Sequence, residues 1–135
     1  MGFWSGITGF DQKRPERIAV EIKLSCGEDE VLTQEMFYIY AYVKGNSQHV
    51  GRARIGVNAR GSKPEFHLAN LDVLGEKNQG HGISSQIMDR FEALIRKHKG
   101  TGSVGDSIKS DSKAAGMYEK RGWRKSKDGK SLIFP

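Results

Sequence analysis

"KNQGHGISSQIM", at residues 77–88, is the stretch that decides how this chain folds. Gly80 and Gly82 flank a histidine, an apolar strand pattern precedes them, and apolar residues at helical spacing follow. The stretch therefore predicts a strand–loop–helix unit, whose first helical N–H groups have no partner in the helix. Because glycine lacks Cβ and a helix start carries partial positive charge, this unit is suited to bind an anion.

Strand patterns precede the loop, and helices and strands alternate after it. Alternating apolar residues predict strands at 17–25, 36–43, 49–57 and 66–74. The helix begins at Ile83 and ends before Gly100. Beyond it we expect a short strand within 102–110, a second helix over 111–122 and a closing hairpin over 123–135. The order is strands, helix, strand, helix, strands.

The last strand before the loop carries the most polar groups. Strict alternation over 66–74 places two sets of side chains on opposite faces. One face is expected to carry His67, Ala69, Leu71 and Val73, and the other Phe66, Leu68, Asn70, Asp72 and Leu74.

Length and composition indicate one globular domain. The chain has 135 residues, of which 36% are hydrophobic and 28% charged, which suits a single core. We expect residues 1–16 to form an irregular arm and 17–135 a single domain. No apolar run reaches membrane-spanning length, and the N-terminus does not resemble a secretory signal. The single cysteine, Cys26, cannot form an internal disulfide, so we expect a cytoplasmic protein.

The net charge of +6 is concentrated toward the C-terminus. From Arg96 to Pro135 there are 11 Lys or Arg against 4 Asp or Glu. This basic third favours an anionic ligand or partner, although most of its lysines are expected to be solvated surface groups.

Two common phosphate-binding motifs do not fit the loop. A P-loop needs Gly-x-x-x-x-Gly-Lys-Ser/Thr, and no such string occurs. A dinucleotide fingerprint needs a third glycine, where Ser85 stands, and the antiparallel strand pattern upstream argues against a doubly wound sheet.

Two segments resemble the GNAT superfamily of N-acetyltransferases. "QGHGIS" (79–84) is similar to its acetyl-CoA pyrophosphate loop, with Gln79 and Gly82 matching and Ser84 at the small last position. "DSKAAGMYEKRGW" (111–123) is similar to a second segment of the family. There Ala114, Tyr118 and Gly122 fall in register, Asp111 replaces an Asn and Trp123 a Phe.

The resemblance covers residues 66–125 and implies an α/β (α+β) fold. The family's mixed, mainly antiparallel sheet of about six to seven strands with two main helices is expected. The family usually has two helices between its first two strands, but here only residues 26–35 are available, so this is a trimmed member. Val73 also sits one residue further from Gln79 than usual, which predicts a bulge or a longer loop.

What the resemblance implies is direct transfer of an acetyl group from acetyl-CoA to an amine. Its pyrophosphate would be held by the backbone of Gln79, Gly80, His81, Gly82, Ile83, Ser84 and Ser85, together with Asp111. A backbone N–H near Val73 or Leu74 would stabilise the developing oxyanion. Tyr118 would be the general acid that protonates the leaving thiolate.

The general base stays open among the side chains on and beside the strand at 66–74. The candidates are Glu65, His67, Asp72 and Glu76, and water is an alternative. Imidazole titrates near neutral pH, which favours His67, whereas Asp72 could point into the cleft. Cys26 is interpreted as structural, and the His and Cys spacing predicts no metal site.

The acceptor and two rival functions also stay open. A small amine, a protein lysine or N-terminus, and an RNA-linked amine are all compatible acceptors. No membrane partner is expected, and the chain would be a monomer or homodimer. The first rival is a nucleic-acid-binding module, suggested by the basic third and by Tyr38, Tyr40 and Tyr42 on one strand face. The second is a degenerate GNAT that binds CoA or a protein without turnover.

Overall fold

A computed structural model describes residues 16–105 and 112–135. Its seven strands form one sheet in the order β2-β3-β4-β5-β6-β8-β7. The strands are β2 (Val20–Leu24), β3 (Met36–Val43), β4 (Gly51–Asn58), β5 (Glu65–Val73), β6 (Thr101–Val104), β7 (Arg124–Lys125) and β8 (Leu132–Ile133). The helices are α1 (Ile83–Lys97) and α3 (Ser112–Lys120), with 3-10 turns η2 (Glu28–Thr33) and η3 (Glu76–Asn78). The predicted fold class is confirmed, while residues 1–15 of the expected arm (1–16) lie outside the described residues.

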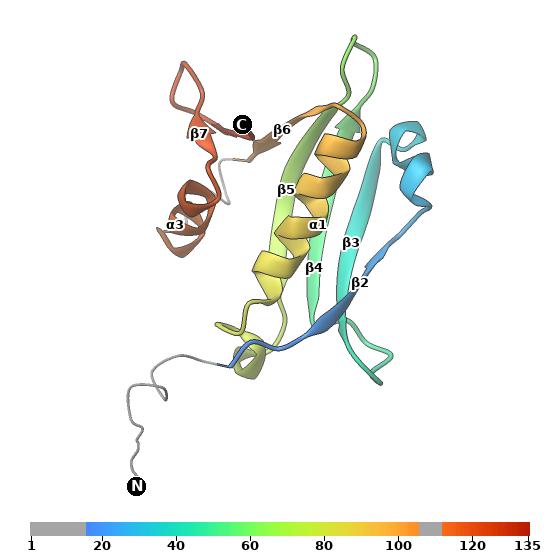
Figure 1. The fold of residues 1–135 in the computed structure, drawn as a ribbon, viewed down its shortest axis with the longest axis vertical. Helices are drawn as coiled ribbons and strands as arrows, with labels where there is room; N and C mark the ends of the chain where they lie inside the picture. Colours follow the sequence, from blue (N-terminus) through green and yellow to red (C-terminus); the bar gives the residue numbers. More distant parts are fainter. Residues whose placement is uncertain (1–15, 106–111) are drawn as a thin grey trace, which may run out of the picture.

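One parallel pair interrupts an otherwise antiparallel sheet. β5 and β6 run parallel, and α1 makes the crossover between them (Figure 1). Every other neighbouring pair is antiparallel. A parallel pair needs a crossover of a dozen or more residues, and the amphipathic stretch after the glycine loop supplies it.

Helix α1 covers one face of the sheet and makes the core. Its apolar residues pack on the inward side chains of β3, β4 and β5, which are fully buried at Phe37, Ile39, Ala53, Ile55, Phe66 and Leu68. Gly51 lets the helix approach closely, because a Cβ there would lie 2.9 Å from both Ile83 Cγ2 and Ile87 Cδ1. Within the described residues, neither helix is long and apolar enough to cross a membrane.

The connection at 26–35 is the single helical turn that its length predicts. Turn η2 buries Val31 completely and is tied to α1 by Glu28, whose carboxylate lies 2.6 Å from Arg90 and 2.8 Å from Lys97. Hydrogen bonds from Lys97 and then Arg90 lower the pKa of the Glu28 carboxyl. Burial of the Cys26 thiol raises its pKa, and the charge of Glu30 adds to this effect. A raised pKa keeps the thiol protonated, which fits a structural role.

A β-bulge in β5 changes which of its residues share a face, so the predicted faces differ from the observed ones. Arg54 pairs with Asn70 but Ile55 pairs with Leu68, so Ala69 is an extra residue on β5. An extra residue reverses the alternation beyond it. Leu71 and Val73 therefore pack against the core, on the same side as Phe66 and Leu68. The prediction that His67 shares a face with Leu71 and Val73 was wrong.

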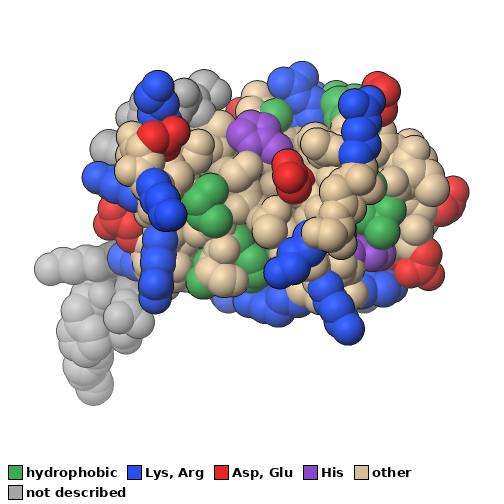
Figure 2. All heavy atoms as spheres, turned by 90° about the horizontal axis from the view of Figure 1, so that it is seen from above, with side chains coloured by type: hydrophobic (Ala, Val, Ile, Leu, Met, Phe, Trp, Pro, Cys, Tyr) green, Lys and Arg blue, Asp and Glu red, His purple; other side chains and the backbone are tan. Residues whose placement is uncertain are grey.

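No helix of the described chain covers the other face of the sheet at β3. Three half-buried tyrosines, Tyr38, Tyr40 and Tyr42, stand there, with the rings of Tyr38 and Tyr40 stacked at 5.6 Å. Their neighbours on β4 are Arg54 and Arg52, and Arg52 is paired with Asp72 at 3.7 Å. On the β2 side, Lys23 Nζ lies 5.1 Å from the centre of the Tyr42 ring. Figure 2 likewise shows Lys and Arg interspersed with Asp and Glu at one end of the molecule. The tyrosine face thus has cations on both sides of β3, one of them paired with Asp72.

The close approach at Gly51 predicts a stability effect. Gly51→Val should lower the free energy of unfolding by about 1–3 kcal/mol, because added carbons overpack the contact with α1. Urea unfolding followed by circular dichroism measures this. Gly116→Ala is the matched control: nothing lies within 4 Å of a Cβ there, so it should be neutral or stabilising. Equal stability of the two variants would contradict the packing argument.

Candidate active site

The site begins where β5 and β6 separate. Their pairing covers only Glu65–Leu68 and Thr101–Val104, and a last bond joins Gly105 N–H to Leu68 O at 3.1 Å. β5 continues to Val73, and beyond Leu68 no described strand pairs with it on this edge. The separation leaves an open edge on β5 that leads toward the start of α1 (Figure 1).

The backbone direction on this edge distinguishes Val73 from Leu74. Leu74 N–H donates to Val50 O at 2.7 Å, on the β4 side. Successive N–H groups of an extended strand point to opposite edges. The N–H of Val73 therefore points away from β4, into the gap beside β6, whereas that of Leu74 is occupied.

The glycine loop places unpaired N–H groups at the end of this edge. Turn η3 takes up the predicted extra length, and Gly80 and Gly82 both adopt a φ of 79°. The first bond within α1 runs from Gln86 N–H to Gly82 O. The N–H groups of Ile83, Ser84 and Ser85 precede it, so they lie outside the helical ladder and can receive an anion.

A segment from the N-terminal side of β2 holds the loop in place. His81 Nδ1 donates to Glu16 O at 2.5 Å, and Ile18 N–H donates to His81 O at 2.9 Å. Gln86 of α1 donates to Ile18 O at 2.6 Å and accepts from Val20 N–H at 3.3 Å. The His81 side chain is therefore turned to this segment, and its role in the loop is to fix the backbone.

Arg17 lies beside the loop, which the sequence did not reveal. A Cβ at Gly82 would lie 3.2 Å from Arg17 Cγ and 3.7 Å from its Nε. The side chain thus lies beside the loop and takes the space a larger residue would need. None of the ion pairs among the described residues involves Arg17. Only tertiary proximity could identify it, since it lies 64 positions before His81 in the sequence.

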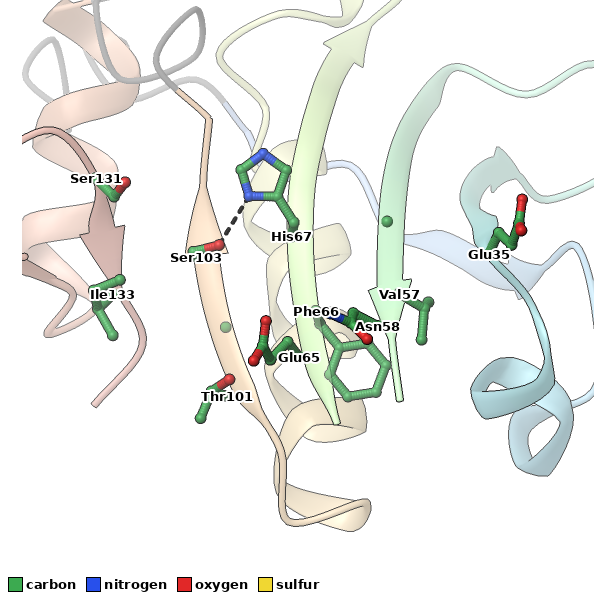
Figure 3. Close-up of a pocket in the computed structure, with 12 residues that line it drawn as sticks. Glu35, Val57, Asn58, Glu65, Phe66, His67, Thr101, Ser103, Ser131 and Ile133 are labelled. Carbon is green, nitrogen blue, oxygen red and sulfur yellow. Dashed lines mark hydrogen bonds between the residues drawn. The ribbon is translucent and has the colours of Figure 1, made fainter. Parts of the chain in front are cut away.

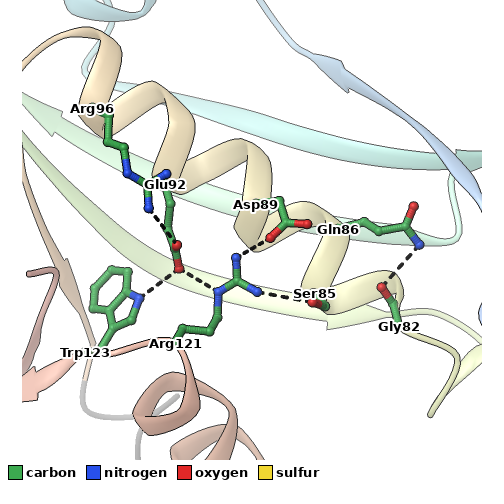
Figure 4. Close-up of polar contacts among 8 residues, drawn as sticks. All are labelled: Gly82, Ser85, Gln86, Asp89, Glu92, Arg96, Arg121 and Trp123. Carbon is green, nitrogen blue, oxygen red and sulfur yellow. Dashed lines mark hydrogen bonds and ion pairs between the residues drawn. The ribbon is translucent and has the colours of Figure 1, made fainter.

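Arg121 clamps the end of α3 onto α1, close to the loop (Figure 4). Its guanidinium donates to Glu92 at 2.6 Å, to Asp89 at 2.5 Å and to Ser85 Oγ at 3.1 Å. Trp123 Nε1 donates to the same Glu92 oxygen at 3.0 Å. Burial opposes the charge of Arg121, but the bonds to Glu92 and Asp89 outweigh it and raise the arginine pKa.

The clamp explains how a carboxylate can be buried here. Glu92 is only 5% exposed, and an unpaired charge there would be costly. Arg121 and the Trp123 N–H satisfy one oxygen, while Arg96 lies 3.6 Å from the other. Ser85 is predicted to bind cofactor. Its hydroxyl accepts a hydrogen bond from Arg121, while its backbone N–H stays outside the helical ladder at the start of α1.

Tyr118 lies in the interior rather than on a surface. It is completely buried, and its ring meets Trp123 edge-on at 5.8 Å. Trp123 in turn stacks on Phe91 of α1 at 6.2 Å. The second resembling segment therefore contributes its two aromatic residues to the core. Asp111, the remaining predicted residue, lies outside the described part of the chain.

The bulge brings His67 and Asp72 to the same face of the sheet, opposite α1. His67 Nδ1 is hydrogen-bonded to Ser103 Oγ at 2.8 Å across the β5–β6 pair (Figure 3). Asp72 is paired with Arg52 at 3.7 Å. No group of three or more His, Cys, Asp or Glu residues in the described ranges is placed to hold a metal ion.

An open strand edge that leads to unpaired N–H groups at a helix start can hold an extended ligand with an anionic end. The family model described as Acetyltransferase (GNAT) domain matches residues 12–131. The chain therefore belongs to the GNAT acetyltransferases. It is an acyltransferase, and acetyl-CoA is its co-substrate. The sequence comparison with curated proteins found no match.

Solved structures share the fold at low sequence identity. Naa50 of Arabidopsis thaliana, in complex with the bisubstrate analogue CoA-Ac-MVNAL, is 16% identical with a TM-score of 0.57, covering 71% of this chain and 69% of its own. PaiA N-acetyltransferase of Thermoplasma acidophilum, in complex with coenzyme A, is 16% identical with a TM-score of 0.58, covering 77% and 62%. The aminoglycoside acetyltransferase meta-AAC0020 from an uncultured soil metagenomic sample, in complex with sisomicin, is 13% identical with a TM-score of 0.58, covering 75% and 86%.

The clamp predicts a large loss of stability on removal of one partner. Arg121→Met should lower the free energy of unfolding by about 3 kcal/mol or more, because Glu92 stays buried without its main cation. Arg124→Met is the control, since Arg124 is exposed on β7 and should change little. Chemical denaturation of both variants measures this, and a small effect of Arg121→Met would show that the clamp is not needed.

Proposed function

We propose that this chain acetylates a primary amine by direct attack of the amine on bound acetyl-CoA, without a covalent enzyme intermediate. The observation that carries the proposal is the alignment of two features. The open edge of β5 beyond Leu68 leads to a glycine-walled group of free N–H donors at the start of α1. One extended ligand can bind at both places: its amide-rich arm would bond to the open edge of β5, and its pyrophosphate would bind the N–H donors at the start of α1.

The phosphates would be held by the backbone from Gln79 to Ser85 and by Arg17. Gly82 has no Cβ to fill the loop, and its φ of 79° suits glycine best. Ser84 has only a small side chain, and its N–H belongs to the first helical turn. Arg17 supplies a full positive charge beside this loop, to add to the partial charge of the helix.

The oxyanion that forms when the amine attacks needs a fixed donor. Leu74 cannot supply it, because its N–H is bonded to Val50. We assign this role to an N–H on the open edge, with Val73 the candidate that the sequence also indicates. A backbone donor on a packed strand costs no rearrangement during the reaction.

The proton transfers are assigned to Tyr118 and His67. Tyr118 is the proposed acid for the leaving thiolate, on the resemblance of its segment to the family. Asp72 is a weaker base candidate than His67, since its carboxylate is paired with Arg52. His67 is exposed and has one ring nitrogen beyond the bond to Ser103.

The loop makes a direct prediction for cofactor affinity. Gly82→Val should weaken acetyl-CoA binding at least tenfold in calorimetry, because the new side chain strains φ and meets Arg17. Arg17→Ala should weaken it severalfold and reduce its salt dependence. The control is Arg60→Ala, in the β4–β5 loop at the far end of β5. If acetyl-CoA binding is absent in the unaltered protein, the proposed function fails.

The acid assignment is tested separately. Tyr118→Phe should lower kcat by about 10²-fold or more, since general acid catalysis contributes this much. Acetyl-CoA affinity should stay within about twofold, because the phosphate loop is untouched. Steady-state kinetics with a simple amine, together with calorimetry, separates these quantities. An unchanged kcat would show that Tyr118 only packs against Trp123.

A further inference from the structure

The sheet face opposite α1 displays a row of aromatic side chains on β3. Tyr38, Tyr40 and Tyr42 are half-buried, so part of each ring is open to solvent. The rings of Tyr38 and Tyr40 are nearly parallel, with their centroids 5.6 Å apart. The ring of His49, centred 4.8 Å from that of Tyr40, widens this tyrosine face on one side.

The helices of the chain lie away from the tyrosine face. Helix α1 packs on the opposite face, in front of the sheet in Figure 1, and α3 is joined to α1 by Arg121. The connection from β2 to β3 could have crossed the tyrosines, but it forms turn η2, which is tied to α1 by Glu28. No helix within residues 16–105 and 112–135 therefore covers the three rings.

Cations flank the tyrosines on both neighbouring strands. On β2, Lys23 pairs with Tyr40, and its Nζ lies 5.1 Å from the centre of the Tyr42 ring. On β4, Arg54 pairs with Tyr38, and its side chain is exposed. None of the ion pairs in the described part of the chain involves Lys23 or Arg54. Both charges can therefore meet an anion from outside.

The carboxylates near the tyrosines do not cancel this charge. Asp72 on β5 pairs with Arg52 on β4 at 3.7 Å, so these two charges offset each other. Glu21 stands on the edge strand β2, and Lys23 and Arg54 outnumber it. The whole chain carries a net charge of +6. The face therefore combines flat aromatic surface with an excess of positive charge, which favours an anionic ligand.

Unpaired nucleobases joined by phosphates have the complementary chemistry. Aromatic side chains on the face of a sheet can stack two or three bases, and any base can stack because each has a π-face. Alternate residues of a strand lie about 6.7 Å apart, so the three tyrosines present their rings along one line. Lys23 and Arg54 stand one strand spacing to either side of that line. Phosphates of a strand that follows β3 would pass within reach of both cations.

We propose that the tyrosine face binds a single-stranded nucleic acid. Its bases stack on Tyr38, Tyr40 and Tyr42, and its phosphates contact Lys23 and Arg54. The site is distinct from the glycine loop, which lies at the start of α1 on the other side of the sheet. The inference therefore goes beyond the proposed acetyl transfer and does not depend on it.

The first test removes the rings but keeps the strand. Fluorescence anisotropy measures binding of the full chain to a labelled single-stranded RNA of about 12 nucleotides, a length within the range of stacking sites. The double variant Tyr38→Ile, Tyr40→Ile should bind about tenfold or more weakly, because stacking is lost while isoleucine still favours a strand. The matched control, Tyr38→Phe with Tyr40→Phe, keeps both rings and should bind within about threefold of the unaltered protein.

Circular dichroism checks that both double variants are folded. Absent binding by the unaltered protein overturns the inference, and so does equal binding by the isoleucine variant. Neither result bears on acetyl-CoA binding, which calorimetry measures separately.

The second test measures the phosphate contacts through salt dependence. Lys23→Gln and Arg54→Gln should each reduce the slope of log affinity against log salt concentration by about 0.7, the value for one phosphate of a single strand. Lys125→Gln is the matched control, because Lys125 is exposed on β7 at the other end of the sheet, and it should leave the slope unchanged. Unchanged slopes in the Lys23 and Arg54 variants would remove both residues from the site and overturn the inference.

The third test uses the unaltered protein and so needs no variant to fold. A duplex of the same sequence should bind about tenfold or more weakly than the single strand, because its bases are already stacked and cannot reach the tyrosines. Equal affinity would show that only phosphates are recognised, which overturns the stacking. Light scattering tests the competing occupant: a dimer that the isoleucine variant dissociates, without RNA binding, would assign the face to a second copy of the chain.

Discussion

The early end of the β5–β6 pairing is the constraint on which the rest of the site depends. A parallel pair is held by backbone bonds, and here these stop at Leu68 and Gly105 while β5 continues to Val73. The backbone beyond this point keeps its donors directed into a gap. The same two strands carry His67 and Ser103 at the last pair but one. The open edge of β5 and the hydrogen bond between His67 and Ser103 therefore lie next to each other.

The packing of α1 keeps this arrangement in position. The helix is close to the sheet at Gly51, fixed to η2 by Glu28 and fixed to α3 by Arg121. Its first turn is thereby held at the end of the open edge, with its N–H groups outward. Because Arg121 is neutralised by Asp89 and Glu92, it contributes rigidity rather than net charge. Arg17 is a cation beside the loop, and none of the ion pairs among residues 16–105 and 112–135 involves it.

Much of the fold and part of the site could be predicted. Periodicity located the first four strands and α1, because apolar alternation and helical spacing are local properties of the sequence. The faces of β5 could not be predicted beyond Leu68, since the bulge at Ala69 arises from pairing with β4. Arg17 and Arg121 were missed for the same reason: each acts on a loop or helix distant in sequence. Tyr118 was singled out by its register, but its complete burial is a property of packing.

The sequence by itself determined the strand–loop–helix unit, the need for glycine at its turn and the resemblance to the GNAT acetyltransferases. These follow from residue types at short spacing, which set the backbone conformation locally. Only the tertiary structure decided that the N–H of Leu74 is bonded to Val50 O and that Asp72 is paired with Arg52. Such facts depend on which strands become neighbours, and hydrogen bonding and charge across strands are fixed only when the sheet forms.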